Sequence, residues 1–268
     1  MNDYFEQDQF PCHDFEVSQM REAFSVLGLD LPKNGVCLDI GGGRGQHAAQ
    51  LTGDGRRIYV TDIYRYHEMN GGAFARDASD LHHRYGRAFD LSSIVFLEMD
   101  AQNILFKDRL FDLVYSINAF EHIPNPFRAL DEIMRVLRPG GLIYIQFDPI
   151  WTSPFGHHHP AHLTDPWLHL ILPEEEVERK LLEASGSDVA VHSYRTEMNR
   201  RSLGEYFHLF EGLQRRFEFE KCQFSWWPTE QAQEPWCEHE NYGKALAKGY
   251  SSAELYVRGF RFVGKLPA

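Results

Sequence analysis

Residues 36–45 read VCLDIGGGRG, a short apolar run that ends in an acid and a cluster of glycines. Such a run is typical of a buried parallel strand, and residues 46–51 are predicted to continue it as a short helix. Glycines at a strand-to-helix turn permit positive φ and let the backbone approach a ligand closely, while the start of the helix offers free N–H groups. We therefore expect a ligand-binding loop that contains Asp39, Gly41, Gly42, Gly43 and Gly45.

The alternation of strands and helices extends over the first half of the chain. Apolar runs predict further strands at 58–62, 94–100, 111–117 and 142–147, and apolar residues at helical spacing predict helices at 14–31 and 127–137. Residues 63–92 are polar and interrupt the alternation, so we expect an insertion that holds at least one helix. Repeated strand–helix units predict an α/β fold, in which helices cover both faces of a parallel sheet.

The second half of the chain is less regular. Residues 148–202 are rich in proline and histidine and contain one charged helical stretch near 174–184, whereas 203–213 predict a helix and 217–222 and 255–263 predict two late strands. We therefore expect four parts. They are an N-terminal helical segment (1–32), a ligand-binding core (33–147), a lid (148–202), and a C-terminal helix with two strands that complete the sheet (203–268).

The charge of the chain argues against two classes of partner. The net charge is −12 over 268 residues and no basic run is present, whereas proteins that bind nucleic acid or anionic membranes show basic faces. No run of eighteen apolar residues predicts a transmembrane helix, and the acidic N-terminus lacks the apolar segment of a signal peptide. The four cysteines form no C-x-x-C pair, which fits a reducing compartment. We expect a cytoplasmic protein with a small-molecule partner, and an oligomer is compatible with the sequence.

The spacing of the glycines separates two kinds of nucleotide loop. A dinucleotide site needs G-x-G-x-x-G/A, and its last position, counted from Gly41, falls on Gln46. The observed spacing is G-x-G-x-G, with Asp39 two residues before the first glycine. This arrangement suits S-adenosylmethionine (SAM), which has no pyrophosphate and whose ammonium group favours a nearby carboxylate.

Two further acids are predicted to end strands. Asp62 ends the second strand and Asp100, followed by Ala101, ends the third. The carboxyl ends of parallel strands form the edge where open α/β sheets bind ligands. At this edge Asp62 can accept hydrogen bonds from both ribose hydroxyls, and Asp100 can accept one from an adenine amino group.

Five segments in sequence order resemble class I SAM-dependent methyltransferases of the broad small-molecule type. They are 38–45 (LDIGGGRG), 60–63 (VTDI), 99–106 (MDAQNILF), 111–123 (FDLVYSINAFEHI) and 137–141 (LRPGG), and they cover about residues 36–147. The resemblance implies a doubly wound sheet of seven mostly parallel strands, with strand seven antiparallel between strands five and six, and a helix-rich lid inserted after strand five. It also implies a transferase that uses SAM as methyl donor and releases S-adenosylhomocysteine (SAH).

The predicted cofactor-binding residues lie in the first four of these segments. They are Asp39, Gly41, Gly42, Gly43, Gly45, Asp62, Ile63, Asp100, Ala101 and Asn118. Two interpretations of Asn118 stay open, because its side chain could line the methionine end of the pocket or cap the next turn. Glu121 and His122 could each serve the site or only the structure of their loop.

Four histidines lie within six positions of the segment 151–162, which follows strand five and should overhang the methyl donor. Three interpretations compete. At least one of His157, His158 and His159 could be a general base, because histidine titrates near neutral pH and a hydroxyl acceptor loses a proton. The segment could instead bind zinc or iron, but no clear set of further ligands stands nearby although two aspartates flank it, and we therefore expect no metal. The third interpretation is packing and hydrogen bonding within the lid.

The sequence gives less information about the methyl acceptor than about the methyl donor. The layout of the lid and the C-terminal residues 256–265 resemble, more weakly, methyltransferases of bacterial cell-surface glycan and secondary-metabolite assembly. We therefore predict O-methylation of a small molecule or saccharide. Arg195, Arg200 and Arg201 could bind an anionic acceptor or form a solvated face. N- or C-methylation, and a non-catalytic SAM-binding module, remain alternatives, while Gln46 disfavours a nicotinamide oxidoreductase.

Overall fold

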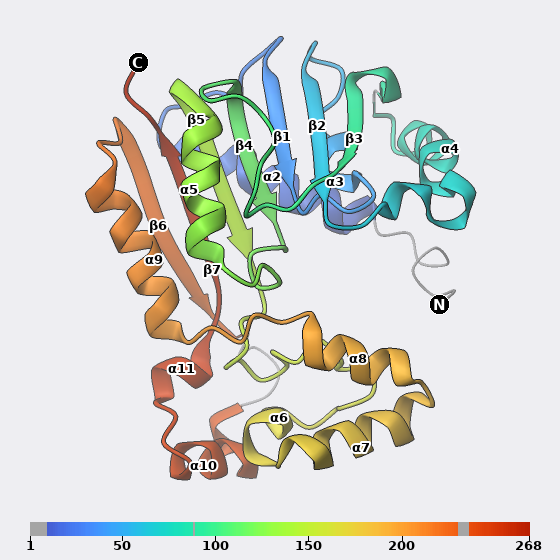
Figure 1. The fold of residues 1–268 in the computed structure, drawn as a ribbon, viewed down its shortest axis with the longest axis vertical. Coiled ribbons are helices and arrows are strands. Elements are labelled where there is room, and N and C mark those ends of the chain that lie inside the picture. Colours follow the sequence, from blue (N-terminus) through green and yellow to red (C-terminus); the bar gives the residue numbers. More distant parts are fainter. Residues whose placement is uncertain (1–9, 88, 230–235) are drawn as a thin grey trace.

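A sheet of seven strands forms the centre of the protein in a computed structural model that describes residues 10–87, 89–229 and 236–268 (Figure 1). The strand order is β3-β2-β1-β4-β5-β7-β6, and β7 pairs antiparallel with both β5 and β6. This confirms the predicted α/β fold, including the position of the antiparallel strand. The strands are β1 (Val36–Ile40), β2 (Arg57–Asp62), β3 (Ile94–Glu98), β4 (Phe111–Ile117), β5 (Leu137–Phe147), β6 (Lys221–Pro228) and β7 (Val257–Lys265).

The register of the parallel strands brings their carboxyl ends to one edge of the sheet. Asp39 of β1 pairs with Val60 of β2 on one side and with Tyr115 of β4 on the other. On the outer side of β2, Asp62 pairs with Glu98 of β3. Because β1 to β5 all run in the same direction, the segments that follow them converge on this edge.

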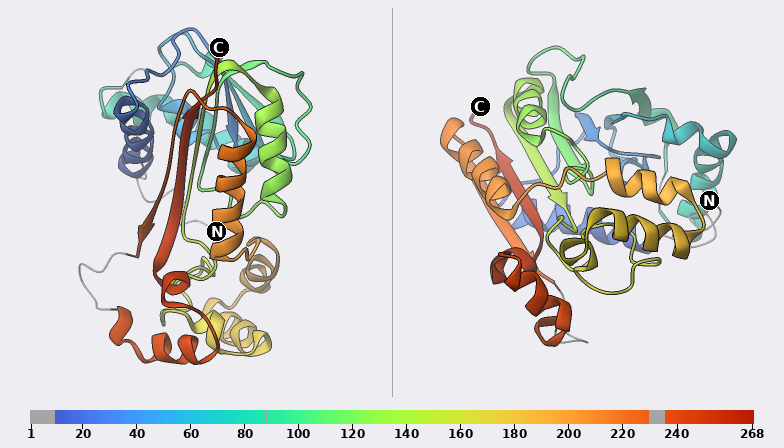
Figure 2. Two further views of the ribbon diagram at one scale, coloured as in Figure 1. Left: turned by 90° about the vertical axis from the view of Figure 1, so that its left-hand side faces the viewer. Right: turned by 60° about the horizontal axis from the view of Figure 1, so that its bottom comes forward.

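Helices cover both faces of the sheet (Figure 2). Helices α2 (Phe10–Val26) and α3 (Gln46–Ala49) pack on one face, where Met20 and Phe24 meet Tyr144 in one apolar cluster. Helices α5 (Pro126–Val136) and α9 (Leu203–Arg216) pack on the other, where Ile133 and Phe210 share a second cluster with strand residues. The Ser202 side chain accepts from the Glu205 backbone N–H and caps α9, which fixes where that helix begins.

The first helix ends earlier than the sequence predicted. Helix α2 runs from Phe10 to Val26 rather than over 14–31, and Gly28 follows it in the left-handed conformation at φ 66°. The Leu29 N–H bonds back to the Phe24 carbonyl, which closes the end of the helix. The chain then turns away, and Leu29 and Leu31 pack against the sheet from outside the helix.

The insertion between β2 and β3 contains a helix, as predicted. It forms the 3₁₀ helix η1 (Tyr66–Glu68), helix α4 (Met69–Arg84) and the 3₁₀ helix η2 (Leu91–Ser93) beside the edge strand β3. Strand β3 ends at Glu98, so Asp100 lies in the turn after the strand rather than at its end.

The lid lies beyond the carboxyl ends of the parallel strands, below the sheet in Figure 1. It contains α6 (Leu168–Ile171), α7 (Glu174–Ser185) and α8 (Asp188–Thr196), and also η3 (Trp236–Glu238), α10 (Glu240–Ala247) and α11 (Ser252–Tyr256), which come from the segment between β6 and β7. Two apolar clusters form its interior, one around Val177 and Leu181 and the other around Trp167 and Leu255. The lid therefore has a core of its own and is built from two separate stretches of chain.

The helices between β6 and β7 were not predicted, and two strand boundaries were wrong. Leu255 and Tyr256 belong to α11, not to the last strand, because Ser251 and Glu254 form a capping box that starts a helix there. Strand β6 begins at Lys221, so residues 217–220 lie outside it. Short apolar runs fit a strand and a buried helix equally well, and Leu255 is buried in the lid. Among the described helices, none has the length and apolar character needed to cross a membrane.

Candidate functional site

The glycine loop forms a tight turn between β1 and α3. Gly41, Gly43 and Gly45 all have positive φ, at 68°, 55° and 83°. The N–H groups of Gly41 and Gly42 both donate to the carbonyl of Thr61 in β2. A Cβ on Gly41 would lie 2.3 Å from the Cβ of Ala119, so the loop after β4 packs directly on the glycine loop. The predicted loop is therefore a narrow backbone cradle at the carboxyl edge of the sheet.

We expect Gly41→Ala to disrupt this cradle. The left-handed backbone and the clash with Ala119 should lower the free energy of unfolding by about 2–4 kcal/mol and remove SAH binding. Gly212→Ala is the matched control, because a Cβ there meets nothing within 4 Å and lies inside helix α9. Chemical denaturation should show the control to be unchanged or slightly more stable. A stable Gly41→Ala variant that binds SAH normally would contradict the packing described here.

Asp39 is a buried acid that lies close to the hydroxyl group of Tyr115. Its side chain is 1% exposed, and neither carboxylate oxygen has a hydrogen-bond partner among the described residues. Burial raises the pKa of Asp39 to about 7, although the charge of nearby His47 opposes this shift. An unsatisfied buried carboxylate next to a glycine cradle fits a ligand that brings a cationic or donor group. The residues present therefore fit the amino-acid end of SAM.

Asp62 faces the same cradle from β2. Its Oδ2 accepts from the Gly43 N–H at 3.0 Å and its Oδ1 from the Tyr64 N–H at 3.4 Å. Partial burial raises the pKa of this acid. The next side chain, Ile63, is 55% exposed and offers an apolar surface beside the carboxylate. This arrangement leaves acceptor capacity for ribose hydroxyls, and the predicted role of both residues stays a prediction.

Asp100 lies in the turn that follows β3, and its side chain accepts hydrogen bonds within that turn. Its Oδ1 accepts from the Gln102 N–H at 2.8 Å and from the Gln102 Nε2 at 3.0 Å, and the side chain is exposed. Ala101 is half-buried beside it. The Asp100 carboxylate thus already stabilises its own turn. The assignment of Asp100 and Ala101 to the adenine end of the cofactor remains a prediction.

Asn118 connects the cradle to the first helix. Its Nδ2 donates to Glu16 Oε1 at 2.6 Å, and the other Glu16 oxygen lies 2.7 Å from His47 Nε2. Burial would raise the pKa of Glu16, but the hydrogen bond and charge of His47 lower it below the ordinary value. Glu16 and His47 were not predicted as site residues, since nothing in the local sequence marks them. They hold α2 against the glycine loop.

The three predicted histidines have different surroundings. His157 is fully buried in the lid, its Nδ1 accepts from the His159 N–H at 2.9 Å, and burial lowers its pKa to about 2. His158 Nε2 donates to the Pro149 carbonyl at 3.0 Å, and burial lowers its pKa to about 4. His159 is half-buried, and its Nε2 has no hydrogen-bond partner among the described residues. His158 and His159 are thus both partly exposed, and each keeps one nitrogen without a hydrogen bond to any described residue: Nδ1 of His158 and Nε2 of His159, of which the His159 atom is buried.

His158 meets the loop that follows β4. Its ring lies edge-on to that of His122, with centroids 4.9 Å apart. The adjacent residue Glu121 is 1% exposed, and neither of its carboxylate oxygens is hydrogen-bonded to any described residue. Burial raises the pKa of Glu121 well above its ordinary value. The fold thus joins the histidine segment to a buried carboxylate that the sequence left unassigned.

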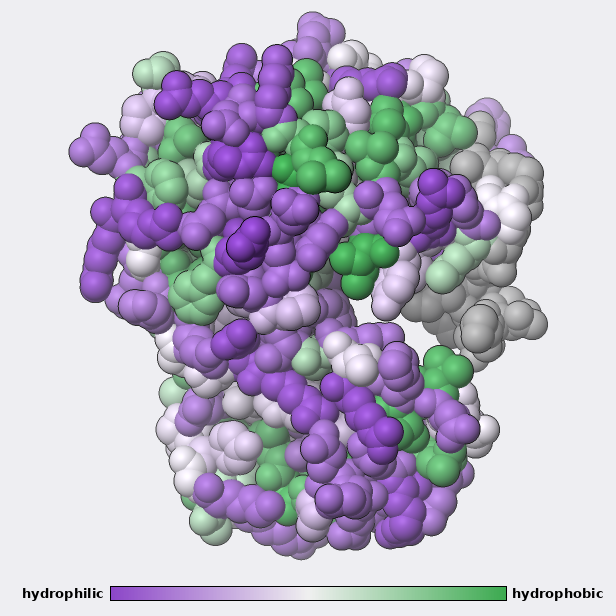
Figure 3. Space-filling view, in the orientation of Figure 1, coloured by the Kyte–Doolittle hydropathy of each residue, from purple (hydrophilic) through white to green (hydrophobic). Residues whose placement is uncertain are grey.

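The lid and the cofactor edge face each other across the site. Tyr66 lies between them: burial raises its pKa to about 12, assisted by the carboxylates of Asp62 in β2 and Glu197 at the end of α8. The Glu197 carbonyl also accepts from His122 Nδ1 at 2.9 Å. Figure 3 shows a notch in the surface between the part that holds the sheet and the part that holds the lid. The sheet and the lid therefore border this notch from opposite sides.

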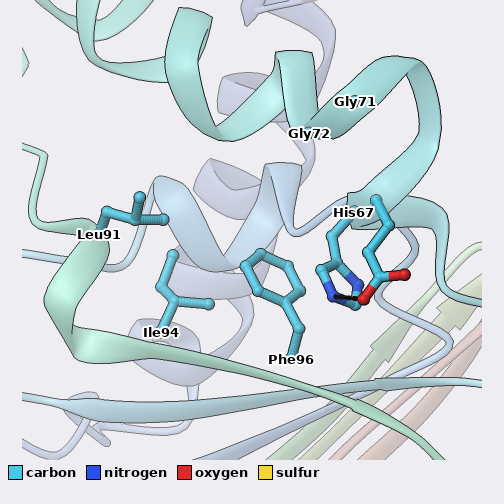
Figure 4. Close-up of a pocket in the computed structure, with 7 residues that line it drawn as sticks. His67, Gly71, Gly72, Leu91, Ile94 and Phe96 are labelled. Carbon is cyan, nitrogen blue, oxygen red and sulfur yellow. Dashed lines mark ion pairs between the residues drawn. The ribbon is translucent and has the colours of Figure 1, made fainter.

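A separate pocket of about 430 Å³ lies between the insertion and β3 (Figure 4). Its walls are His67, Glu68, Gly71, Gly72, Leu91, Ile94 and Phe96. The His67 ring stacks on the Phe96 ring, with the ring centroids 4.4 Å apart. The Phe96 ring also packs against the backbone of Gly45, where an added Cβ would lie 2.8 Å from it. The pocket is thus on the far side of the glycine loop from Asn118 and the lid, and we do not assign it to the cofactor.

Comparison with known proteins identifies the core. A family model described as a methyltransferase domain matches residues 38–145. An uncharacterized methyltransferase of Mycobacterium sp. (strain KMS) is 35% identical over 127 residues, which are 47% of this chain and 44% of that protein. One from Mycobacterium leprae (strain TN) is 31% identical over 127 residues, 47% of this chain and 42% of that protein. The match thus spans less than half the length of these relatives.

Solved structures share the fold at low identity. Phosphoethanolamine N-methyltransferase 2 of Haemonchus contortus, in complex with phosphomonomethylethanolamine and SAH, has a TM-score of 0.53 and 16% identity over 93% of this chain and 53% of its own. A SAM-dependent methyltransferase from Methanococcus maripaludis, so far assigned only by similarity, has a TM-score of 0.51 and 16% identity over 98% and 89%. The cyclase SpnF has a TM-score of 0.51 and 15% identity over 95% and 81%. One fold therefore serves different reactions.

Proposed function

Because residues 38–145 form a class I methyltransferase domain, we propose that this chain is an enzyme that transfers a methyl group from SAM to a small molecule or saccharide, at a hydroxyl oxygen. The observation that carries the cofactor assignment is the buried carboxylate of Asp39 beside the glycine cradle, whose oxygens have no hydrogen-bond partner in the described part of the chain. SAM would supply an activated methyl group on a sulfonium. The residues of this chain would bind, orient and desolvate the two reactants.

Each part of the site would hold one end of the cofactor. Asp39 would pair with the ammonium group, and the backbone of the glycine loop would enclose the methionine portion. Asp62 would accept hydrogen bonds from the ribose hydroxyls. Asn118, held by Glu16, would keep α2 closed over this end of the pocket. The methyl group would then point toward the lid, where the His158 ring touches His122 of the loop after β4.

The lid favours a hydroxyl acceptor over an anionic one. Arg195, Arg200 and Arg201 each form an ion pair with a glutamate, at 2.5, 2.8 and 2.7 Å. Their charges are therefore already compensated. Arg201 also donates to the Pro124 carbonyl of the loop after β4, at 3.0 Å, so its guanidinium is further engaged there. On the same loop His158 touches His122, and His159 is its chain neighbour. Neutral imidazoles can accept or donate hydrogen bonds to a hydroxyl group, and one can take up its proton.

The proposed step balances without another reactant. The acceptor oxygen bonds to the methyl carbon as the carbon–sulfur bond breaks, and the electron pair of that bond returns to sulfur, which gives SAH. The hydroxyl proton passes to His159, whose Nε2 is not hydrogen-bonded to any described residue. His157 would instead support the segment, since its ring is buried between His169 and the His159 backbone.

Turnover with methyl-labelled SAM tests the proposal. The purified chain would be incubated with separate panels of sugars, phenols and amines, and both SAH release and transfer of label would be measured. Label on a hydroxyl group supports the proposal. Label that appears only on nitrogen or carbon refutes O-methylation, and SAM binding without label transfer to any panel favours the non-catalytic module.

We expect His159→Asn to lower kcat by about 100-fold, because a general base contributes roughly 10²–10⁴ in rate. SAH affinity should stay within twofold of the wild type, as measured by calorimetry. His162→Asn is the matched control, since it changes an exposed histidine three residues further along the same segment. If His159→Asn and the control have equal rates, His159 is not the base.

A further inference from the structure

Glu121, His122 and His158 form a compact group at the border between the cofactor edge and the lid. One nitrogen or carboxylate oxygen from each of the three lies within 4.8 Å of the others. Glu121 Oε1 is 3.9 Å from His122 Nε2, which is too long for a hydrogen bond. Two imidazoles and a carboxylate therefore converge without bonding to one another.

The carboxylate of Glu121 is the unusual member of this group. It is 1% exposed, and neither oxygen has a hydrogen-bond partner in the described part of the chain. Even a protonated carboxyl would need an acceptor for its O–H, and none is within reach among those residues. Leaving such a group unpaired is strongly unfavourable, which points to a ligand that completes it.

The two histidines are oriented by backbone carbonyls. His122 Nδ1 donates to the Glu197 carbonyl at 2.9 Å, and His158 Nε2 donates to the Pro149 carbonyl at 3.0 Å. A carbonyl only accepts, so each neutral ring keeps a lone pair on its other nitrogen. For His122 that nitrogen is Nε2, the atom nearest Glu121. Metal-bound histidines typically donate their second ring N–H in this way.

A second group of the same composition provides a contrast. His13, Glu16 and His47 also place three ligand-type atoms within 4.8 Å of one another. There, however, Glu16 bonds to His47 at 2.7 Å and to Asn118 at 2.6 Å. This carboxylate is satisfied by protein groups, so of the two groups only the one around Glu121 has a carboxyl without a hydrogen-bond partner among the described residues.

We propose that Glu121, His122 and His158 bind a divalent transition-metal ion such as Zn²⁺, with further coordination positions open toward the acceptor. Two histidines and one carboxylate are a known ligand set for catalytic zinc and for other divalent ions with open positions. Ligand atoms on one zinc ion lie roughly 3.3 Å apart, so atoms that are now up to 4.8 Å apart must approach by as much as about 1.5 Å. The side chains of His122 and His158 are only partly buried and can move by that amount.

The role of the ion rests on the proposed function, whereas its binding does not. Glu121 and His122 follow Ala119, whose side chain packs on Gly41, so the site is next to the cradle for the methyl donor. A divalent ion that holds the acceptor hydroxyl would lower its pKa, as it does for bound water. The hydroxyl would then give up its proton more readily, and its oxygen would be methylated as in the proposed step. The sequence alone predicted no metal because the search for ligands was limited to the histidine segment. It did not include Glu121 and His122, which the fold brings close to His158.

Metal titration of chelator-treated full-length protein tests the site directly. Zn²⁺ binding would be followed by calorimetry, and Co²⁺ by its visible absorption, without SAM or acceptor. We expect one equivalent with a dissociation constant of 10 µM or tighter. Glu121→Gln and, as a second variant with a solvent-accessible side chain, His122→Asn should each weaken binding at least 100-fold, with folding checked by circular dichroism. Glu16→Gln, the matched control, should keep wild-type metal affinity.

The outcomes separate this inference from the proposed function. Absence of one-equivalent binding, or binding lost in Glu16→Gln but kept in Glu121→Gln, would overturn the metal site. Methyl transfer that survives exhaustive chelation would overturn the role of the ion while leaving the methyltransferase proposal intact. Stoichiometric metal binding by a protein that neither binds SAH nor transfers a methyl group would support the site and refute the function.

Discussion

Replacing Asp39 by asparagine is expected to stabilise the ligand-free protein and to abolish its affinity for SAH. The folded protein raises the pKa of Asp39 from 3.8 to about 7 because the carboxyl is buried. A raised pKa stabilises the fold below the unfolded value, and that contribution is lost as the pH rises through about 7. At pH 8 the ionised acid therefore opposes folding, and Asp39→Asn should recover up to about 4 kcal/mol. The same change removes the charge that would pair with the cofactor.

Urea unfolding at pH 5 and pH 8 measures the stability effect. The wild type should lose stability between these values relative to Asp39→Asn, and the difference between the two proteins should grow toward pH 8. Asp131→Asn is the matched control, because Asp131 is a half-exposed residue on α5 paired with Arg216 and should change stability little. If Asp39→Asn is less stable than the wild type at pH 8, the carboxylate has a stabilising partner in the folded protein.

The part of the site that sequence could predict is the part encoded locally. Residues 36–45 specify a strand, a turn and a helix start within ten positions, and Gly41, Gly43 and Gly45 adopt the positive φ that only glycine accommodates readily. The alternation of strands and helices then fixed the parallel sheet, because a parallel connection has few allowed arrangements. The antiparallel place of β7 came from resemblance to a family, not from periodicity.

The contacts that sequence could not predict join distant positions. Glu16 and Asn118 are hydrogen-bonded across 102 positions in the chain, and no short pattern records such a pair. His158 meets His122 because β5 ends beside the loop after β4, while its neighbour His157 turns into the lid. Three adjacent histidines with identical chemistry thus occupy three environments, which only the fold distinguishes.

The predicted extent of the lid, residues 148–202, was too small for a related reason. Residues 236–256 pack on Trp167 and Leu170 through Leu255 and Ala245, so the second half of the lid arrives late in the chain. Their apolar residues are sparse and their helices short, and such segments gain their stability from packing rather than from local preference. The lid is therefore assembled from two stretches, which explains why its composition could not be read from residues 148–202 alone.

Asp62→Ala is expected to weaken SAH binding by about 100-fold, because hydrogen bonds to a charged group contribute roughly 1.5–3 kcal/mol each. Asp62 is held in place by the N–H groups of Gly43 and Tyr64, so its carboxylate is pre-oriented for the ribose. Asp100→Ala should weaken binding less than tenfold, because that carboxylate is exposed and already bonds to Gln102.

Calorimetric titration of SAH into the two variants compares the acids directly. Glu98→Ala is the matched control, since Glu98 ends the neighbouring strand β3 and its side chain is 59% exposed in an ion pair with Arg65. Its SAH affinity should equal that of the wild type. If Asp100→Ala weakens binding more than Asp62→Ala does, the adenine end rather than the ribose end dominates recognition. That ordering would also mean that Gln102 releases Asp100 when the cofactor binds, because the free protein keeps this carboxylate within its own turn.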